Sequence, residues 1–93
     1  MGRTNRIIVT VLGRDRVGII AGVAQVLAEN NVNILDISQT ILQEFLAMVM
    51  IADMGASRVD LTTLKAQLDA RGKELGVRID AQHEDAFLYM HRI

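Results

Sequence analysis

The chain has 93 residues, which is enough for one small domain with a single hydrophobic core. Its formal net charge is −1 with basic and acidic residues interspersed, a balance that does not favour nucleic acid or a membrane surface as a partner. The absence of cysteine excludes disulfides and thiolate metal sites. No apolar run is long enough to span a membrane, and the polar first residues lack the apolar segment of a signal peptide. We therefore expect a cytoplasmic protein.

The chain begins with a predicted strand and a predicted helix. Residues 6–12 are apolar on both alternating faces, which is typical of a strand in the interior of a sheet. Residues 17–30 carry an apolar stripe with helical spacing, and Asn31 suits the left-handed position just past a helix end. The stripe consists of Ile19, Ile20, Val23, Val26 and Leu27.

Two further strands follow, joined by a turn at Gln43-Glu44. Residues 32–42 mix polar and apolar side chains, which favours the edge of a sheet. Their unbroken alternation predicts that Ile34 and Asp36 share a face. Residues 45–53 are apolar on both faces and are predicted to form a second interior strand.

The last third of the chain predicts a helix, a strand and an apolar tail. Asp60 is a candidate N-cap for a helix that has a leucine stripe and ends near Gly76. Residues 77–84 alternate cleanly and form a second edge strand. Residues 85–93 form a short apolar tail that has a one-sided stripe if it is helical. The stripe would contain Ala86, Phe87, Met90 and Ile93.

The order of these elements and the polarity of the strands predict one fold class. Interior first and third strands with edge second and fourth strands indicate an α+β, ferredoxin-like βαββαβ sandwich. Its antiparallel sheet has the order 4-1-3-2, with both helices on one face and a core spanning about residues 6–84. The other face also carries apolar residues, so we expect burial against a second copy in a homodimer or higher homo-oligomer.

The junction between the first strand and the first helix is the candidate site. It reads Gly13-Arg14-Asp15-Arg16-Val17-Gly18, followed by Ile19. Backbone N–H groups at a helix start attract a carboxylate, Asp15 suits an ammonium group, and Arg14 or Arg16 would reinforce the carboxylate site. The alternative is that Asp15 only caps the helix and that the two arginines are solvated.

This junction resembles the start of an ACT domain, a small-molecule-sensing regulatory module. The resemblance runs from about residue 7 to residue 84 and implies a single ACT domain over residues 1–93, similar to the free-standing UPF0237 type. Val17 stands where the family usually has proline, so the turn lacks the rigidity that proline would give. The resemblance implies that the ligand is an amino acid or a related metabolite bound at residues 13–19.

The resemblance also implicates Asn33 and Ile34, at the start of the second strand. Family members often have Asn followed by Ile here, and this Asn commonly binds a ligand across a subunit interface. The alternative for Asn33 is that it is a polar residue that finishes the helix-to-strand turn. The polar residues that follow, among them Asp36 and Gln39, are interpreted mainly as edge-strand pairing groups.

Other functions find less support in the sequence. His83-Glu84-Asp85 does not predict a metal site, because successive strand residues face opposite ways. The sequence has no plausible catalytic set and no phosphate loop, so we expect no enzyme activity, no metal and no cofactor. Two alternatives remain. One is a ligand-free interaction module that regulates a metabolic enzyme or transcriptional regulator, and the other is a detached regulatory part of an amino-acid or folate enzyme.

Overall fold

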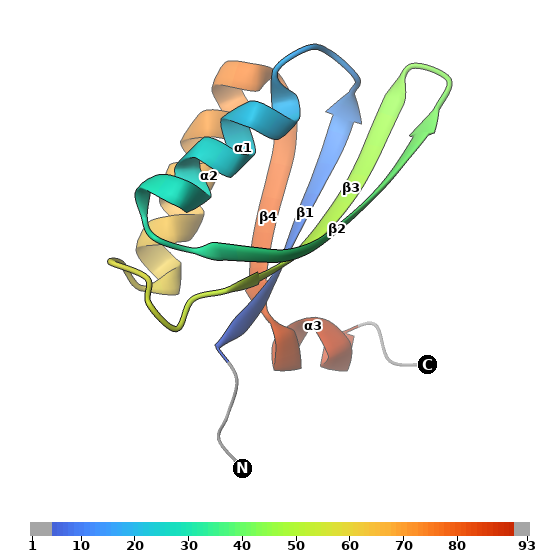
Figure 1. Ribbon diagram of the computed structural model, residues 1–93. Helices are drawn as coiled ribbons and strands as arrows, with labels where there is room; N and C mark the ends of the chain where they lie inside the picture. Colours follow the sequence, from blue (N-terminus) through green and yellow to red (C-terminus); the bar gives the residue numbers. More distant parts are fainter. Residues whose placement is uncertain (1–4, 91–93) are drawn as a thin grey trace.

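The computed structural model describes residues 5–90, and the side chain of Met90 is outside that description. The elements, shown in Figure 1, are β1 Arg6–Arg14, α1 Ile19–Glu29, β2 Asn33–Leu42, β3 Phe45–Asp53, α2 Leu61–Leu75, β4 Val77–His83 and α3 Glu84–Met90. The strands form one antiparallel sheet of order β2-β3-β1-β4, which is the predicted order read from the other edge. The predicted fold class is therefore confirmed.

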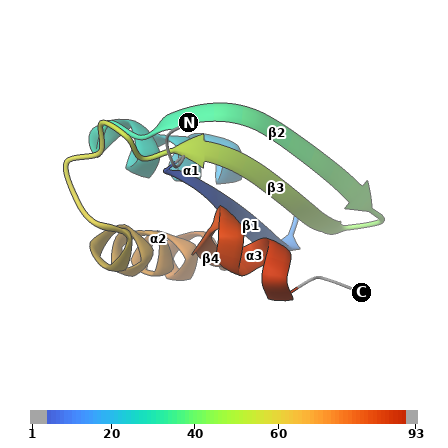
Figure 2. The same cartoon turned by 90° about the horizontal axis from the view of Figure 1, so that it is seen from below.

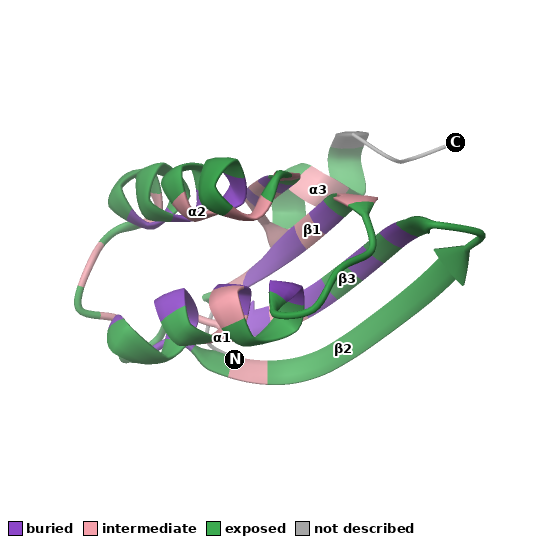
Figure 3. Ribbon diagram, turned by 90° about the horizontal axis from the view of Figure 1, so that it is seen from above, coloured by how far each residue is buried: buried purple, intermediate pink, exposed green. Residues whose placement is uncertain are grey.

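The hydrophobic core lies between the sheet and the helices α1 and α2. Figure 3 shows buried segments on the facing sides of these layers, with exposed segments on their outer sides. The strand side consists mainly of alternate residues of β1 and β3, because successive strand side chains point to opposite faces. The largest fully buried side chains are Ile7, Val9, Val11, Ile19, Val23, Leu27, Met48, Met50, Leu64 and Leu68.

Helix α1, Ile19–Glu29, begins two residues later than the predicted range of residues 17–30. Gly18 is its N-cap and has a left-handed backbone with φ of 95°, so Val17 stays outside the helix. Ile20 is 42% exposed, so it lies beside the core rather than in it. The prediction for the other end is confirmed, since Asn31 has a φ of 60° immediately after the C-cap Asn30.

Strand β2 forms the predicted edge but contains a β-bulge that breaks the predicted alternation. Ile34 pairs with Ala52, whereas Asp36 pairs with Ile51, which leaves Leu35 as the extra residue. The expectation that Ile34 and Asp36 share a face was therefore wrong. Because a bulge shifts the phase of a strand by one residue, Ile37 takes the helix side instead.

Helix α2 has the predicted start and end. The backbone N–H of Thr63 donates to the Asp60 carboxylate at 2.9 Å, and this hydrogen bond lowers the pKa of Asp60. Gly76 closes the helix with a φ of 75°. Near that end, the buried Gly72 faces β4 so closely that an added Cβ would lie 2.7 Å from the carbonyl oxygen of Val77. The helix and the strand can meet because residue 72 has no side chain.

The tail forms a helix, α3, on the sheet face opposite α1 and α2, which we call the open face (Figure 2). It contacts β1 and β4, and an ion pair of 2.8 Å between Arg6 and Glu84 fixes its start. Phe87 packs into the same hollow as Ile8, and Ala86 is exposed. Residues 91–93 of the predicted tail, with Ile93 of its stripe, lie outside the described residues. None of the helices in residues 5–90 has the length and apolarity that crossing a bilayer requires.

Candidate ligand pocket at the β1–α1 turn

The turn between β1 and α1 leaves the start of the helix open. The first helical hydrogen bond runs from the Gly22 N–H to the Gly18 carbonyl at 2.8 Å. No described side chain caps this helix, so the N–H groups of its first turn have no capping partner there. Asp15 is therefore not the helix cap, so that part of the alternative interpretation is wrong, whereas Arg14 and Arg16 are exposed, as it expected.

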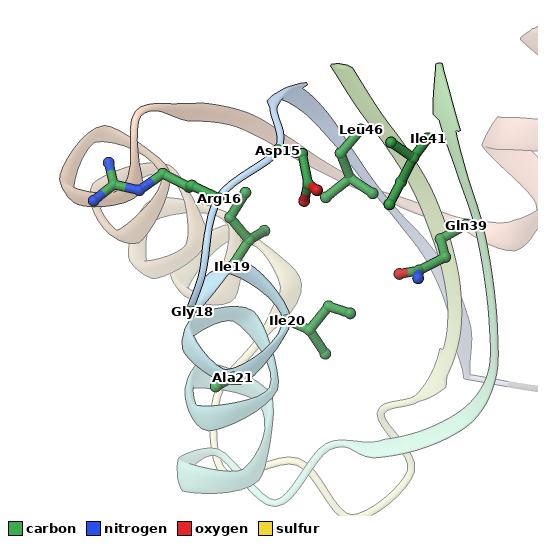
Figure 4. Close-up of a pocket in the computed structure, with 9 residues that line it drawn as sticks. All are labelled: Asp15, Arg16, Gly18, Ile19, Ile20, Ala21, Gln39, Ile41 and Leu46. Atoms are coloured by element: carbon green, nitrogen blue, oxygen red, sulfur yellow. The ribbon is translucent and has the colours of Figure 1, made fainter. Parts of the chain in front are cut away.

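A pocket of about 160 Å³ lies between this helix start and the strands β2 and β3. Figure 4 shows the lining residues Asp15, Arg16, Gly18, Ile19, Ile20, Ala21, Gln39, Ile41 and Leu46. The carboxylate of Asp15 points into the space between the turn and the sheet, where Ile20, Ile41 and Leu46 form an apolar wall. The pocket thus combines one acidic group, open helix N–H groups and an apolar side.

The position of Asp15 is fixed by its backbone. Its N–H donates to the carbonyl oxygen of Glu44 at 2.7 Å, which ties the turn to the β2–β3 hairpin. The neighbouring Arg14 lies 3.7 Å from the Glu44 carboxylate in an exposed ion pair. Such a pair is worth little because water screens it.

The two arginines of the turn direct their guanidinium groups to other partners than the pocket. Arg16 donates from Nη1 to the Leu75 carbonyl oxygen at 3.1 Å, at the C-terminal end of α2. Figure 4 shows its guanidinium directed away from the pocket, although the residue itself contributes to the lining. The Arg14 side chain is exposed and does not line the pocket. Within one chain, Asp15 is the charged group that faces the cavity.

Gly13 and Val17, two residues of the predicted site, lie outside the pocket. Gly13 lies within β1 and pairs with Leu46 and Val77. A Cβ on Gly13 would lie 2.7 Å from the Val77 side chain, so glycine is needed for sheet packing at this point. Val17 is 98% exposed. Neither residue lines the pocket.

Asn33 and Ile34 lie at the far end of the sheet from the turn. Asn33 is exposed and pairs with Asp53, which in turn pairs with Arg6 at the start of β1, whereas the turn follows the end of that strand. Ile34 packs against the core. One chain therefore does not bring these two residues together with Asp15, Arg16, Gly18 and Ile19.

Five lining residues were not predicted as site residues: Ile20 and Ala21 of α1, and the sheet residues Gln39, Ile41 and Leu46. Leu46 of β3 pairs with Ile41 of β2, and Gln39 lies two residues before Ile41 on the same face of β2. Sheet register is the information that places them beside the helix start, and it depends on the bulge at Leu35.

The groups facing the pocket suit a small molecule with an ammonium and a carboxylate. The Asp15 carboxylate accepts hydrogen bonds from a cation, and open N–H groups at a helix start donate to an anion. The described lining contains no histidine, cysteine or serine, which are common nucleophiles or bases. Residues 5–90 contain no group of three histidines or acidic residues placed to hold a metal ion.

Comparison with known proteins places the chain in a family. Residues 5–82 match the family model of the ACT domain. The chain belongs to the ACT domain family. ACT domains are generally regulatory and ligand-binding, and they commonly oligomerise.

Similar proteins extend over nearly the whole of this ACT domain. A UPF0237 protein from Methanocaldococcus jannaschii is 56% identical over 89 residues, which cover 96% of this chain and 99% of that protein. A UPF0237 protein from Clostridium acetobutylicum is 52% identical, with 92% of this chain and 97% of that protein covered. Both relatives therefore consist of little beyond the matched region.

Solved structures agree with the family assignment. The ACT domain protein from Streptococcus pneumoniae matches with a TM-score of 0.79 and 38% identity, over 91% of this chain and 96% of that chain. The regulatory subunit of aspartate kinase from Thermus thermophilus matches with a TM-score of 0.65 and 20% identity, over 86% of this chain and 52% of that chain. The latter likeness shows a shared fold only.

Proposed function

We propose that this ACT domain is a non-catalytic regulatory module that senses an amino acid or a related small metabolite at the β1–α1 turn. The observation that carries the proposal is the shared pocket of the Asp15 carboxylate and the uncapped start of α1. An α-ammonium group would bind Asp15, and the α-carboxylate would accept from the helix N–H groups. The apolar wall of Ile20, Ile41 and Leu46 would receive the side chain of the ligand.

A second copy would complete the site at a dimer interface. Strand β2 is an edge strand, so its outer side is open to pairing with another chain. Two β2 strands paired antiparallel about a two-fold axis would bring the Asn33 end of one copy beside the Ile41 end of the other. That end borders the pocket, since Ile41 lines it. Such pairing accounts for a role of Asn33 and Ile34 despite their distance from the turn within one chain.

Ligand binding at such an interface would regulate by changing how copies associate with each other or with a metabolic enzyme. A ligand that contacts both copies stabilises the paired state by its differential affinity for that state.

Calorimetry after a thermal-shift screen of the common amino acids tests the proposal. Asp15→Ala should lower the binding affinity for the ligand found in the screen by roughly tenfold to a hundredfold, because a charge-assisted hydrogen bond is worth about 1.5–3 kcal/mol. The matched control is Asp69→Ala, which removes an exposed carboxylate on α2 and should leave the affinity unchanged. Asn33→Ala should also weaken binding if the second copy contributes to the site.

Two outcomes would contradict this proposal. Unchanged affinity in Asp15→Ala would reduce that residue to a structural part of the turn. A screen in which no amino acid raises the melting temperature would favour the ligand-free interaction module instead.

A further inference from the structure

A second hollow lies on the open face of the sheet, on the opposite side from the pocket at the turn. Its volume is about 430 Å³, against about 160 Å³ for the pocket at the turn. This volume lies within the range of small-molecule sites, which is about 300–1,000 Å³. The residues that line the hollow come from β1, β3, β4 and α3. Figure 2 shows that α3 lies over the β1–β4 side of the sheet, so a helix bounds the hollow on one side.

The floor of the hollow is apolar and follows the two central strands. Ile8 and Leu12 of β1 lie there beside Ala47 and Val49 of β3. Leu12 is 51% exposed and Val49 is 39% exposed, so the floor has apolar surface that a ligand can remove from water. Phe87 of α3 closes the end at Ile8, because α3 directly follows β4, and the last residues of β4 pair with the first residues of β1 (Figure 1).

The charged groups of the hollow lie along β4, whereas Asp36 of the same face lies on β2 and outside the hollow. Arg78 donates from Nε to the Asp80 carboxylate at 3.2 Å. The two Nη groups of Arg78 have no hydrogen-bond partner within residues 5–90. They form the edge of the guanidinium that faces away from Nε, so a carboxylate can accept from them without displacing Asp80. An ammonium group at Asp80 would instead lie directly beside the guanidinium, so the hollow favours an anion.

The cationic end and the aromatic end of the hollow are far apart. Leu12 pairs with Arg78, and Ile8 pairs with Gln82, so the two ends are separated by four residues along β4. Four residues of a strand span about 13 Å at about 3.3 Å per residue. An extended chain of about ten carbon atoms has this length, since each C–C bond is about 1.5 Å long and the chain is zigzag. The length of the floor therefore favours an aliphatic chain over a compact ring.

We propose that the hollow is a second ligand site, which binds a medium-chain aliphatic carboxylate. The carboxylate accepts hydrogen bonds from the Nη groups of Arg78. The chain lies over Leu12 and Val49, and its methyl end meets Phe87. Burial of each CH₂ group stabilises the complex, because apolar surface leaves water. The site uses no residue that lines the pocket at the turn, so it goes beyond the proposed function and does not rest on it.

Titration of the isotope-labelled full chain with octanoate, followed by amide NMR spectra, tests the proposal. Octanoate should shift the amide signals of Arg78, Asp80 and Phe87 and leave that of Gly18 in place. Octanol and octylamine carry the same chain with a neutral and a cationic head group, and each should bind roughly threefold to tenfold more weakly than octanoate. From butyrate to decanoate, the affinity should rise by roughly twofold to fourfold per added CH₂ group, because each group covers more of the floor.

A substitution at the charged end tests the role of Arg78. Arg78→Gln should lower the affinity for octanoate by roughly threefold to tenfold and leave the affinity for octanol unchanged, because only the anion uses the guanidinium and water weakens this exposed contact. The matched control Lys65→Gln removes the same charge from an exposed position of α2 and should keep the octanoate affinity. Asp15→Ala should also keep it, which separates this test from that of the proposed function.

A bulky side chain in the floor tests the place of the aliphatic chain. Val49→Trp should fill the hollow and abolish the octanoate-induced shifts. The control Thr40→Trp adds the same ring to an exposed position of β2 on the same face, outside the hollow, and should keep them. If Val49→Trp does not fold, Arg78→Gln still decides, since Arg78 is exposed. Octanoate that shifts no amide of the open face, as when another molecule seals the hollow, would overturn the proposal, as would equal octanoate affinities of wild type and Arg78→Gln.

Discussion

Gly18 sets the geometry of the turn through its backbone and not through close packing. Its φ of 95° lies in the left-handed region, and a Cβ added there would meet no atom within 4 Å. Gly18→Ala should therefore destabilise the protein by about 1–2 kcal/mol through backbone strain alone. Gly18→Asn should cost less, because asparagine tolerates this conformation better. Urea unfolding of both variants measures the difference, and equal costs would show that another mechanism operates.

The residues that line the pocket divide into those that the sequence could place there and those that it could not. Asp15 and Gly18 line the pocket, as the short turn before the helix predicts, and their binding role stays a prediction. Arg16 also lines the pocket, but the direction of its guanidinium was not predictable, since its long stem reaches either the pocket or the Leu75 carbonyl and the three-dimensional position of α2 decides between them. Gln39 required the register of β2, which a local pattern does not give.

The contact between α2 and β4 depends on the absence of one side chain. Gly72→Ala should lower the unfolding free energy by about 1–3 kcal/mol, because its Cβ would meet the Val77 backbone, which cannot turn aside. The control is Gly22→Ala in α1, where the nearest atom is the flexible Leu75 Cδ1 at 2.9 Å. Alanine's better helix propensity, worth about 1 kcal/mol, should largely offset that contact. If denaturation curves show equal losses at the two positions, the close approach at Gly72 is not limiting.

The cap of α2 should make stability depend on pH. The hydrogen bond from the Thr63 backbone N–H lowers the folded-state pKa of Asp60 below its ordinary value of 3.8. A depressed carboxyl pKa stabilises the fold fully above the unfolded-state value, and this stabilisation is lost as pH falls through the folded value. Asp60→Ala should thus lower the urea midpoint at neutral pH and differ little from wild type in strong acid. A mutational difference that stays constant down to strong acid would contradict this role of the carboxylate.

At the level of elements, the polarity of each strand predicted its place in the sheet, but the sequence did not predict which residues of β2 face the helices. The mixed composition of β2 identified it as an edge, and the two-sided apolar character of β1 and β3 identified the interior strands. The bulge at Leu35 escaped prediction because both alternating phases of β2 contain apolar residues, so neither phase was clearly preferred.

For the whole molecule, the fold followed from agreement between independent patterns, but the place of the tail did not. The sequence shows a one-sided apolar stripe in residues 85–93 if they are helical, and the structure contains a helix there, α3 over Glu84–Met90. A stripe alone does not say whether it packs on its own sheet or on that of a second copy. The structure places α3 on β1 and β4 of the same chain.

Removing most of α3 should affect the whole molecule. A chain that ends after Ala86 lacks Phe87 and uncovers Ile8, so it should lose roughly 2 kcal/mol of stability and aggregate or dissociate. A chain that ends after Met90 retains the helix and serves as the control. Sedimentation and thermal melting measure both effects. A shortened chain that stays soluble, equally assembled and equally stable would show that the open face needs no cover.

The hydrogen bond from the Asp15 N–H to the Glu44 carbonyl oxygen allows opening of the pocket to be followed by amide hydrogen exchange. This proton belongs to the one residue that would bind an ammonium group, yet it is held by the hairpin that forms the opposite wall. Its rate of exchange with deuterium therefore measures how often the turn separates from the hairpin. A single peak in an amide spectrum reports on opening of the pocket, with no label added and no ligand identified in advance.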